Sequence, residues 1–305
     1  MDVRAADWFA RRTSSSDDWP LEALLHAKAA TRVSVVLPAR NEESTIAEVV
    51  SRIRADLAGT LVDELVVIDS LSSDATAAEA RAAGVVVHSV ADIRPDLGIS
   101  AGKGEALWKS LFVTSGDVLV FIDSDLAEWG THFVTGLLGP LLSDPTTLLV
   151  KGFYDRVADL DGVQSTEGGR VTELVARPLI SLRFPELAGV VQPLAGEWAV
   201  RRSLFAEITV PVGYGVEFAT LLATLDRGGL EAIAQVDLGR RAHRHQSVHD
   251  LGVMATEILA VADGFEGAAT LAQPDRTAPD SWRQREVPTA VRPPANSVPA
   301  GDPRC

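Results

Sequence analysis

Short apolar runs alternate with helical patterns between residues 33 and 125, and this alternation constrains the fold most. The runs cover residues 33–37, 64–68, 85–87 and 118–122. Each is of strand length and apolar at successive positions, which is typical of parallel strands buried on both faces. Residues 44–57 carry apolar side chains at helical spacing, and 75–83 and 103–114 are the next expected helices. The sequence therefore predicts a doubly wound, mostly parallel α/β sheet with right-handed crossovers.

Polar residues follow three of these strands. They are the segments 38–42, 69–70 and 123–125. In doubly wound sheets, ligands bind at the carboxyl edge of the strands. The three polar strand ends therefore predict a binding site of nucleotide size at that edge.

The rest of the chain is less regular. We expect a fifth strand at 148–153, a loop at 155–169, a helix at 171–182 and an extended segment at 192–201. A helix at 216–227, a strand at 233–238 and a helix at 247–263 follow. Seven of the 16 prolines lie from Pro274 onward, which predicts a disordered tail. The expected divisions are a lead-in at 1–31, a nucleotide-binding half at 32–155, a second half at 156–265 and the tail at 266–305.

Charge and cysteine content narrow the class of protein. The net charge of -14 argues against a nucleic-acid surface, because phosphate backbones need a wide basic footprint. The single cysteine, Cys305, excludes an intrachain disulfide and fits a reducing compartment. No apolar run has the length of a membrane span, and no signal-peptide pattern is present. We expect a cytoplasmic protein.

The first candidate site is Asp123-Ser124-Asp125, at the end of the run 118–122. In an extended segment, residues two apart point to the same side, so both carboxylates can face one site. Carboxylate oxygens suit a divalent cation and a sugar hydroxyl. A solvated strand end or a helix N-cap pair is the structural alternative.

The second candidate is His243, which lies among Arg241, Arg244 and His245. A histidine can complete a mixed His/carboxylate metal site, and an arginine beside it can neutralise a departing diphosphate. A hydrogen-bonded structural histidine is the alternative.

Three further segments offer anion or sugar contacts. Lys103 stands between two glycines at a helix start, where backbone can approach phosphate. Arg170 and Thr172 stand in a similar arrangement and can clamp a second phosphate. Glu217, at the start of the helix 216–227, can bind sugar hydroxyls. A surface lysine and an exposed helix carboxylate are the alternatives for Lys103 and Glu217.

Several of these motifs resemble GT-A-fold glycosyltransferases. They are residues 37–43 (LPARNEE), 68–70 (IDS), 102–104 (GKG), 122–125 (IDSD) and 241–244 (RAHR). With residues 169–172 (GRVT) and 192–197 (QPLAGE), the resemblance narrows to the glucosyl-3-phosphoglycerate synthase family, over residues 20–265.

The resemblance implies a retaining transferase with a GT-A-type sheet. The reaction would move glucose from UDP-glucose to the 2-hydroxyl of 3-phosphoglycerate, giving glucosyl-3-phosphoglycerate. It also implies Mg²⁺, Mn²⁺ or another divalent ion as cofactor, and a homodimer.

The resemblance also assigns residues to roles. The implied catalytic residues are Lys103, Asp123, Asp125, Glu217 and Arg241. The implied donor-binding residues are Pro38, Ala39, Arg40, Glu42, Ser70, Lys103, Asp123, Ser124, Asp125, Glu217 and Arg241. The implied acceptor-binding residues are Gly169, Arg170, Thr172, Leu194 and His245, and the implied metal ligands are Asp125 and His243.

Two alternatives stay open on the sequence. One is a GT-A glycosyltransferase with another donor or acceptor, such as mannosyl transfer to a phosphoglycerate. The other is a non-catalytic module that binds a nucleotide sugar. Turnover of UDP-glucose distinguishes the second alternative from an enzyme.

Overall fold

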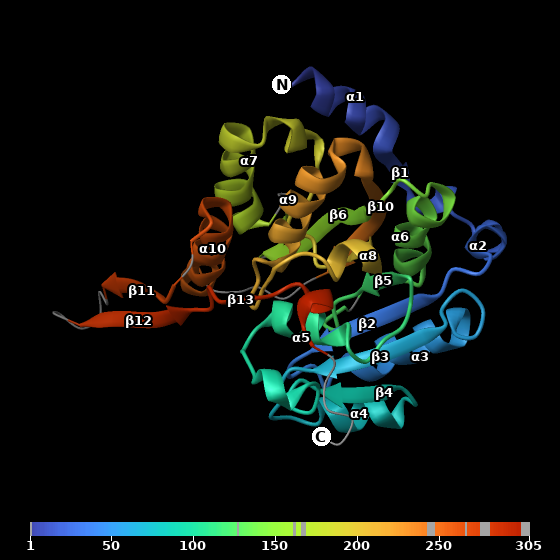
Figure 1. Ribbon diagram of the computed structural model, residues 1–305, viewed down its shortest axis with the longest axis horizontal. Coiled ribbons are helices and arrows are strands. Elements are labelled where there is room, and N and C mark those ends of the chain that lie inside the picture. The colour runs from blue at the N-terminus through green and yellow to red at the C-terminus, as the bar shows by residue number, and fades with distance from the viewer. Residues whose placement is uncertain are drawn as a thin grey trace.

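A nine-stranded sheet forms the centre of the part of the chain that the structure describes (Figure 1). The computed structural model describes residues 2–126, 128–160, 163–165, 169–242, 248–265, 267–274 and 281–299. The strand order is β1-β10-β6-β8-β5-β2-β3-β4, and β7 pairs with β6. The strands are β1 Thr13–Ser15, β2 Val33–Ala39, β3 Glu64–Asp69, β4 Val86–Ser89, β5 Val118–Phe121, β6 Leu149–Leu160, β7 Val163–Ser165, β8 Trp198–Arg201 and β10 Ile233–Ala242.

The predicted parallel core is confirmed. Strand β2 runs parallel to β3 and β5, and β3 runs parallel to β4. Strand β8 lies antiparallel between β5 and β6, and β10 runs parallel to β6. Strands β2 and β5 are almost wholly buried, as their continuous apolar runs predict. This is the doubly wound, mostly parallel α/β sheet that the sequence predicts.

Helices cover both faces of the sheet, as Figure 1 shows. One apolar core packs α2, α3, α4 and α6 against one face, and another packs α1, α5, α7 and α9 against the other. The helices are α1 Val3–Arg12, α2 Leu21–Lys28, α3 Ile46–Leu57, α4 Thr76–Ala82, α5 Lys103–Ser110, α6 His132–Ser143, α7 Arg177–Arg183, α8 Arg202–Phe205, α9 Val216–Gly228 and α10 Val248–Asp263.

The loops that follow β2 and β3 are bonded to each other at the carboxyl edge. Asn41 has a left-handed backbone with φ of 59°, and its Oδ1 accepts from the backbone N–H of Ser73 at 2.8 Å. The Glu43 carboxylate accepts from the backbone N–H of Ala75, also at 2.8 Å. These bonds hold two of the three predicted polar strand ends in one rigid unit.

The expected lead-in at 1–31 contributes directly to the sheet. Strand β1 pairs in parallel with β10 at the sheet edge. The Trp8 side chain of α1 is fully buried, and its Nε1 donates to the carbonyl of Ile233 at 2.9 Å. The amino-terminal segment therefore closes one edge of the fold.

The expected loop at 155–169 is wrong in its described part. Strand β6 continues to Leu160 and pairs with β7. Strand β10 also outlasts its expected end at residue 238, because Gly239, with φ of 80°, absorbs a register shift before pairing resumes. The polar side chains of both extensions indicated loops. Strands pair through backbone hydrogen bonds, and the polarity of the side chains does not reveal these bonds.

The disordered tail expected at 266–305 is also wrong where the structure describes it. Strand β13 (Val291–Arg292) pairs with β9 (Val210–Pro211). The Arg292 guanidinium donates to both carboxylate oxygens of Glu105 at 2.7 Å, and Trp108 Nε1 donates to the carbonyl of Pro293 at 2.8 Å. The prolines here mark extended backbone on a sheet edge, which composition alone does not distinguish from disorder.

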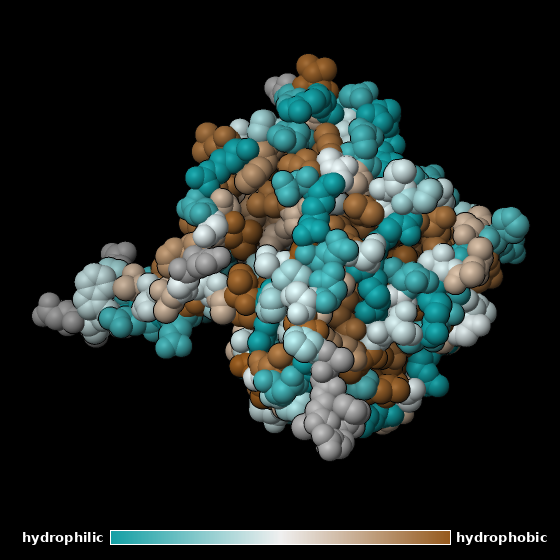
Figure 2. Space-filling view, in the orientation of Figure 1, coloured by the Kyte–Doolittle hydropathy of each residue, from teal (hydrophilic) through white to brown (hydrophobic). Residues whose placement is uncertain are grey.

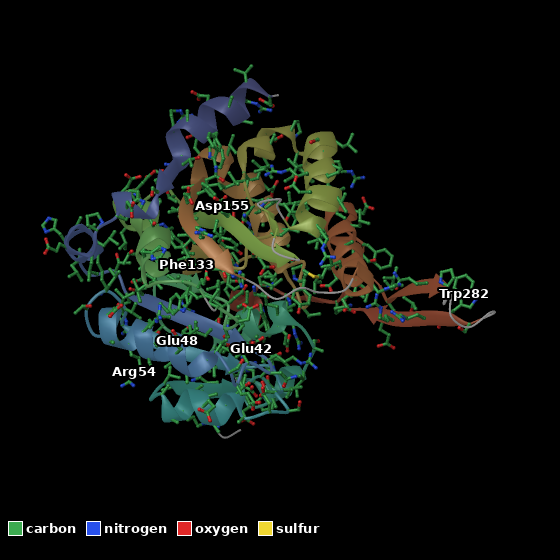
Figure 3. The ribbon with its side chains drawn as sticks, turned by 180° about the vertical axis from the view of Figure 1, so that it is seen from behind. Glu42, Glu48, Arg54, Phe133, Asp155 and Trp282 are labelled. Atoms are coloured by element: carbon green, nitrogen blue, oxygen red, sulfur yellow. The ribbon has the colours of Figure 1, made fainter. Side chains whose placement is uncertain are left out.

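A two-stranded arm stands out from the rounded body in Figures 1 and 2. Strands β11 (Ala269–Pro274) and β12 (Trp282–Val287) form it as an antiparallel pair. The Trp282 side chain lies out on this arm and is 60% exposed (Figure 3). Arg285 of the arm pairs with Asp250 of α10 at 2.8 Å, which ties the arm to the body.

Candidate active site

Charged side chains from distant segments meet at the carboxyl edge of the central strands. Asp123 follows β5, and Arg241 lies near the end of β10. Strand β8 runs opposite to β5 and pairs Phe121 with Trp198, so Glu197, just before β8, lies at the same edge. The antiparallel insertion of β8 thus adds a carboxylate to a site that the parallel strands define.

Lys103 connects two of the predicted catalytic carboxylates. Its Nζ lies 2.5 Å from Asp123 Oδ1 and 2.8 Å from Glu217 Oε1. Lys103 is the first residue of α5, and Glu217 is the second residue of α9. Two helix starts and one strand end therefore converge on a single ammonium group.

Arg241 joins the same cluster from the other side. Its guanidinium lies 2.6 Å from Asp125 Oδ1, 2.8 Å from Glu197 Oε1 and 3.4 Å from Asp123 Oδ2. It also donates to the hydroxyl of Tyr154 at 2.7 Å. The side chain is only 6% exposed, so these contacts are largely shielded from water.

The mutual contacts determine the charge states. Burial by itself raises the pKa of Asp123, but Lys103 and Arg241 outweigh it and hold that pKa well below its usual range. Burial likewise opposes the charged form of Lys103, and Asp123 and Glu217 raise its pKa well above the usual value. Arg241 behaves in the same way, with Glu197 as its largest favourable partner. At neutral pH the site therefore presents two fixed cations beside the ionised carboxylate of Asp123.

One glycine and two hydroxyl groups hold the Asp123-Ser124-Asp125 segment in place. A Cβ atom at Gly196 would lie 2.7 Å from the Asp123 Cγ, so only glycine leaves room for this carboxylate. The Ser124 hydroxyl donates to the carbonyl of Pro38 at 2.8 Å, and the Ser124 carbonyl accepts from Thr45 Oγ1 at 2.7 Å. Ser124 thus anchors the segment to β2 and to the start of α3.

Comparison with known proteins decides the family. Residues 34–208 match the model of Glycosyl transferase family 2. A glucosyl-3-phosphoglycerate synthase of Mycobacterium tuberculosis (strain CDC 1551 / Oshkosh) is 50% identical over 246 residues, which cover 79% of this chain and 76% of that protein. Another, from Mycolicibacterium paratuberculosis (strain ATCC BAA-968 / K-10), is 43% identical over 315 residues, covering 96% and 94%.

A solved structure agrees. The crystal structure of the Mycobacterium tuberculosis synthase in complex with Mn²⁺, UDP-glucose and phosphoglyceric acid matches with a TM-score of 0.82 at 44% identity, covering 91% of this chain and 95% of that chain. This chain belongs to the glucosyl-3-phosphoglycerate synthases. It is a glycosyltransferase, and the predicted GT-A-type fold is confirmed.

The predicted donor residues of this synthase family member lie at the sheet edge described above. Pro38 and Ala39 end β2, and Ser70 follows β3, with its backbone N–H donating to the carbonyl of Ala39 at 2.8 Å. Arg40 is exposed, and the backbone N–H of Glu42 donates to Thr76 Oγ1 at 2.7 Å. Their contact with a nucleotide stays a prediction.

Asp69 lies in the predicted polar strand end 69–70, but the sequence reasoning gave it no role in donor binding. It ends β3 beside Ala39 and is 9% exposed. Its Oδ1 is buried and has no hydrogen-bond partner among the described residues. A buried carboxylate oxygen of this kind is costly unless a ligand donates to it. The signal was present, because Asp69 stands at the same strand end as the predicted Ser70.

Two other residues of the cluster, Glu197 and Lys151, were not predicted. Burial raises the pKa of the fully buried Glu197, while Arg241 opposes that rise. Lys151 of β6 is 1% exposed, and its Nζ donates to the carbonyl of Ala195 at 2.7 Å. Burial lowers the Lys151 pKa to about 8. Charged residues inside strand-like sequence were the available signal.

Of the two predicted metal ligands, only Asp125 can be placed. Its side chain is 35% exposed, and carboxylate oxygen is a ligand that hard divalent ions prefer. His243 belongs to residues 243–247, which are outside the described part of the chain. Within the described ranges, no group of three or more His, Cys, Asp or Glu side chains is arranged to hold an ion. Asp125 fits a divalent ion, and the pairing with His243 stays a prediction.

The predicted acceptor residues come from separate segments of the chain. Gly169 and Arg170 precede the short π-helix Thr172–Ala176; Thr172 is buried and Arg170 is exposed. Leu194 lies two residues before Gly196, which contacts Asp123, so it stands close to the cluster in sequence. His245 falls outside the described residues. The acceptor assignments therefore stay predictions.

Proposed function

We propose that this chain transfers glucose from UDP-glucose to the 2-hydroxyl of 3-phosphoglycerate and releases UDP. The observation that carries the proposal is its similarity, over 91% of its length, to the synthase crystallised with Mn²⁺, UDP-glucose and phosphoglyceric acid. The cluster of Lys103, Asp123 and Arg241 at the carboxyl edge of the sheet supports it, because nucleotide ligands bind at this edge.

Departure of UDP requires stabilisation of negative charge, and Lys103 and Arg241 supply it in this proposal. Their carboxylate neighbours keep both side chains charged throughout the neutral pH range. Both are held by ion pairs before a ligand binds, so little reorganisation accompanies the reaction. Preorganised charge in a shielded site is worth far more than the same charge in water.

A divalent ion fits beside these cations. Four carboxylates, those of Asp123, Asp125, Glu197 and Glu217, contact only two cationic side chains within the described residues. Asp125, and His243 in the proposed pairing, would hold the ion. A bound divalent ion would add Lewis-acid stabilisation of the diphosphate.

Glu217 binds sugar hydroxyls in this proposal and is not the nucleophile. Its carboxylate is 5% exposed and ion-paired with Lys103 at 2.8 Å, which lowers its tendency to attack a carbon atom. Retention of the anomeric configuration then follows from same-face attack assisted by the departing phosphate. Incubation with UDP-glucose followed by intact-protein mass spectrometry tests this route. A glycosyl-enzyme adduct on Glu217 would contradict it.

The acceptor contacts are proposed from the family motif. Arg170 and Thr172 would bind the phosphate and carboxylate of 3-phosphoglycerate, with Gly169, Leu194 and His245 completing the acceptor site. Glycerol 3-phosphate, which lacks the carboxylate, is the matched probe. In the wild type, the KM for glycerol 3-phosphate should exceed the KM for 3-phosphoglycerate. Loss of this difference in Arg170→Ala would assign the carboxylate to Arg170.

Release of UDP from UDP-glucose tests the function directly. We expect release that depends on 3-phosphoglycerate and Mg²⁺ and that EDTA abolishes. Parallel reactions with GDP-glucose, UDP-mannose and GDP-mannose test the alternative donors. If the chain binds UDP-glucose but turns it over with none of the acceptors tried, the result would contradict an enzymatic function and favour a binding module.

Location and assembly complete the proposal. Among the described residues, none of the helices is long and apolar enough to cross a bilayer. The single cysteine fits the reducing conditions of a cytoplasmic enzyme. An isolated pair of strands is at best marginally stable in water, so the exposed two-stranded arm supports a homodimer that covers it. Light scattering on the purified chain measures its mass in solution.

A further inference from the structure

Glu257 of α10 is a buried carboxylate outside the catalytic cluster. It is 3% exposed, although it stands in an otherwise apolar part of the helix packed on α9. Its carboxyl group accepts from the backbone N–H groups of Tyr214 and Gly215, the two residues that precede α9. Glu257 therefore caps the start of α9 from a neighbouring helix.

Gly213 packs directly against the Glu257 carboxyl group. A Cβ atom at Gly213 would lie 2.8 Å from the Glu257 Cδ and closer still to Oε2. On its other side the same Cβ would lie 3.0 Å from the Pro288 side chain. The loop 211–215 is thus enclosed between α10 and the segment that leads to β13.

The same loop also caps α5. The carbonyls of Val212 and Gly213 accept from the backbone N–H groups of Glu105 and Gly104, at 2.9 and 3.1 Å. Gly104 allows this approach, because a Cβ there would lie within 3.0 Å of the Pro211 carbonyl carbon. The loop 211–215 therefore accepts hydrogen bonds from the backbone N–H groups in the first turn of α5, and it leads directly into the first turn of α9.

These two helix starts carry the Lys103–Glu217 pair. Lys103 is the first residue of α5 and Glu217 the second of α9, and their charged atoms lie 2.8 Å apart. Lys103 also reaches Asp123 at 2.5 Å. A shift of the loop 211–215 moves both members of the pair, and small displacements at such sites carry large catalytic penalties.

We propose that Glu257 is a positioning residue for glucosyl transfer: its carboxyl group fixes the loop 211–215 and thereby sets the relative placement of Lys103 and Glu217. The inference rests on the proposed function and deepens it. Glu257 acts through the backbone of Tyr214 and Gly215 and through the helix starts that they join.

The titratable groups around Glu257 are consistent with an uncompensated carboxylate. Glu217 on α9 is the charged side chain that acts on it electrostatically, with the same sign of charge. Burial raises the pKa of Tyr214 in the loop; Lys103 lowers this pKa, and Glu257 raises it. Arg285 of the arm pairs with Asp250 of α10. The contacts that hold Glu257 are therefore backbone N–H groups.

Three variants at this position separate positioning from bulk stability. We expect Glu257→Ala to lower kcat/KM for UDP-glucose at least about 10-fold, because the loop loses its anchor. Glu257→Gln should restore kcat/KM to within about 3-fold of the wild type, since its amide oxygen still accepts from the loop. Glu257→Asp should fall between them, because its carboxyl group is one methylene short.

Glu64→Ala is the matched control. The Glu64 carboxylate also anchors a loop, accepting from the backbone N–H of Ser115 at 2.8 Å and from the Ser34 hydroxyl at 2.5 Å. Glu64 begins β3, so it lies at the opposite edge of the sheet from the catalytic cluster. We expect this variant to lower the Tm and to leave kcat and KM for UDP-glucose unchanged at a temperature where every variant is folded.

The readouts distinguish failure of the inference from failure of the function. Affinity for UDP-glucose is measured by calorimetry with Mn²⁺, and turnover by UDP release with 3-phosphoglycerate. Wild-type binding without turnover contradicts the function, and the effect of Glu257→Ala on affinity still tests the inference. Wild-type kinetics in folded Glu257→Ala, or a loss in Glu64→Ala of equal size, overturns it. If Glu257→Ala does not fold, wild-type kinetics in Glu257→Asp overturns it.

Discussion

Replacing Gly196 by alanine tests the geometry of the catalytic cluster with one added methyl group. In the present structure the new Cβ would lie 2.7 Å from the Asp123 Cγ, whereas ordinary contacts begin at 3.4 Å. The Asp123 carboxylate must therefore move by at least about 0.7 Å, because its Oδ2 lies closer to the added Cβ than its Cγ does. That movement takes it away from Lys103 Nζ at 2.5 Å or from Arg241 at 3.4 Å. The backbone at residue 196 does not require glycine, because its φ is not in the left-handed region.

The expected loss follows from that displacement. A misplacement of about 1 Å in a catalytic group costs on the order of 10²-fold in rate. This corresponds to about 2.7 kcal/mol in the activation barrier. We therefore expect Gly196→Ala to lower kcat for UDP release by about 10²-fold, with a smaller change in KM, because the displaced group serves the reacting centre.

Steady-state UDP release with saturating 3-phosphoglycerate is the assay. Gly252→Ala is the matched control, because residue 252 lies inside α10 and its added Cβ meets only side-chain atoms of the arm at 3.1 Å or more. The control should keep wild-type kcat. A Gly196→Ala protein that is folded and retains kcat within about 3-fold of the wild type would refute the claim that the position of Asp123 limits the reaction.

Three further predictions concern protons, metal and the tail. Burial raises the pKa of Glu257 to about 7 from 4.5, so the stability associated with its protonated form is present below pH 4.5 and is lost as pH rises through 7. Glu257→Gln removes this dependence. Urea denaturation should show its free energy of unfolding, relative to that of the wild type, rising by about 3 kcal/mol between pH 4.5 and 8. Parallel curves of unfolding free energy against pH for the two proteins would contradict this. Asp125→Ala should weaken Mn²⁺ binding in the presence of UDP by at least about 10-fold in calorimetry, and an unchanged affinity would remove Asp125 from the metal site. Arg292→Ala leaves the fully buried Glu105 without its bidentate partner and should lower stability by about 3 kcal/mol, whereas an unchanged Tm would show that the tail is dispensable.

Much of the nucleotide-binding half could be predicted from local sequence. The runs that became β2, β3 and β5 are continuous and apolar because both faces of these strands are buried, and that burial leaves its mark on the strand's own residues. Parallel strands with short turns place their carboxyl ends together. The location of Asp123 at the binding edge therefore required no knowledge of the other strands.

The residues beyond this half were harder to predict. Strand β10 and the extension of β6 carry polar side chains, and the tail is rich in proline, yet all three pair through backbone bonds. A backbone bond to a distant strand depends on what that strand offers, which a local pattern does not contain. The resemblance assigned roles to Arg241 and Glu217, although nothing local to either residue indicated that Arg241 meets Asp123 and Asp125 or that Glu217 meets Lys103.

The sequence by itself determined the class of fold, the edge at which ligands bind and several of the charged residues there, but not Glu197 or Lys151. Only the tertiary structure decided their partners. Arg241 meets Asp123, 118 residues away in sequence, because the strand order places β10 and β5 in one sheet with β6 and β8 between them. Strand β8 runs antiparallel to β5, and this reversal brings Glu197 into the cluster. Glu257 reaches the backbone before α9 because α10 packs there. Strand order and helix packing are set by the whole chain burying its apolar surface at once, and for that reason no single segment of sequence records them.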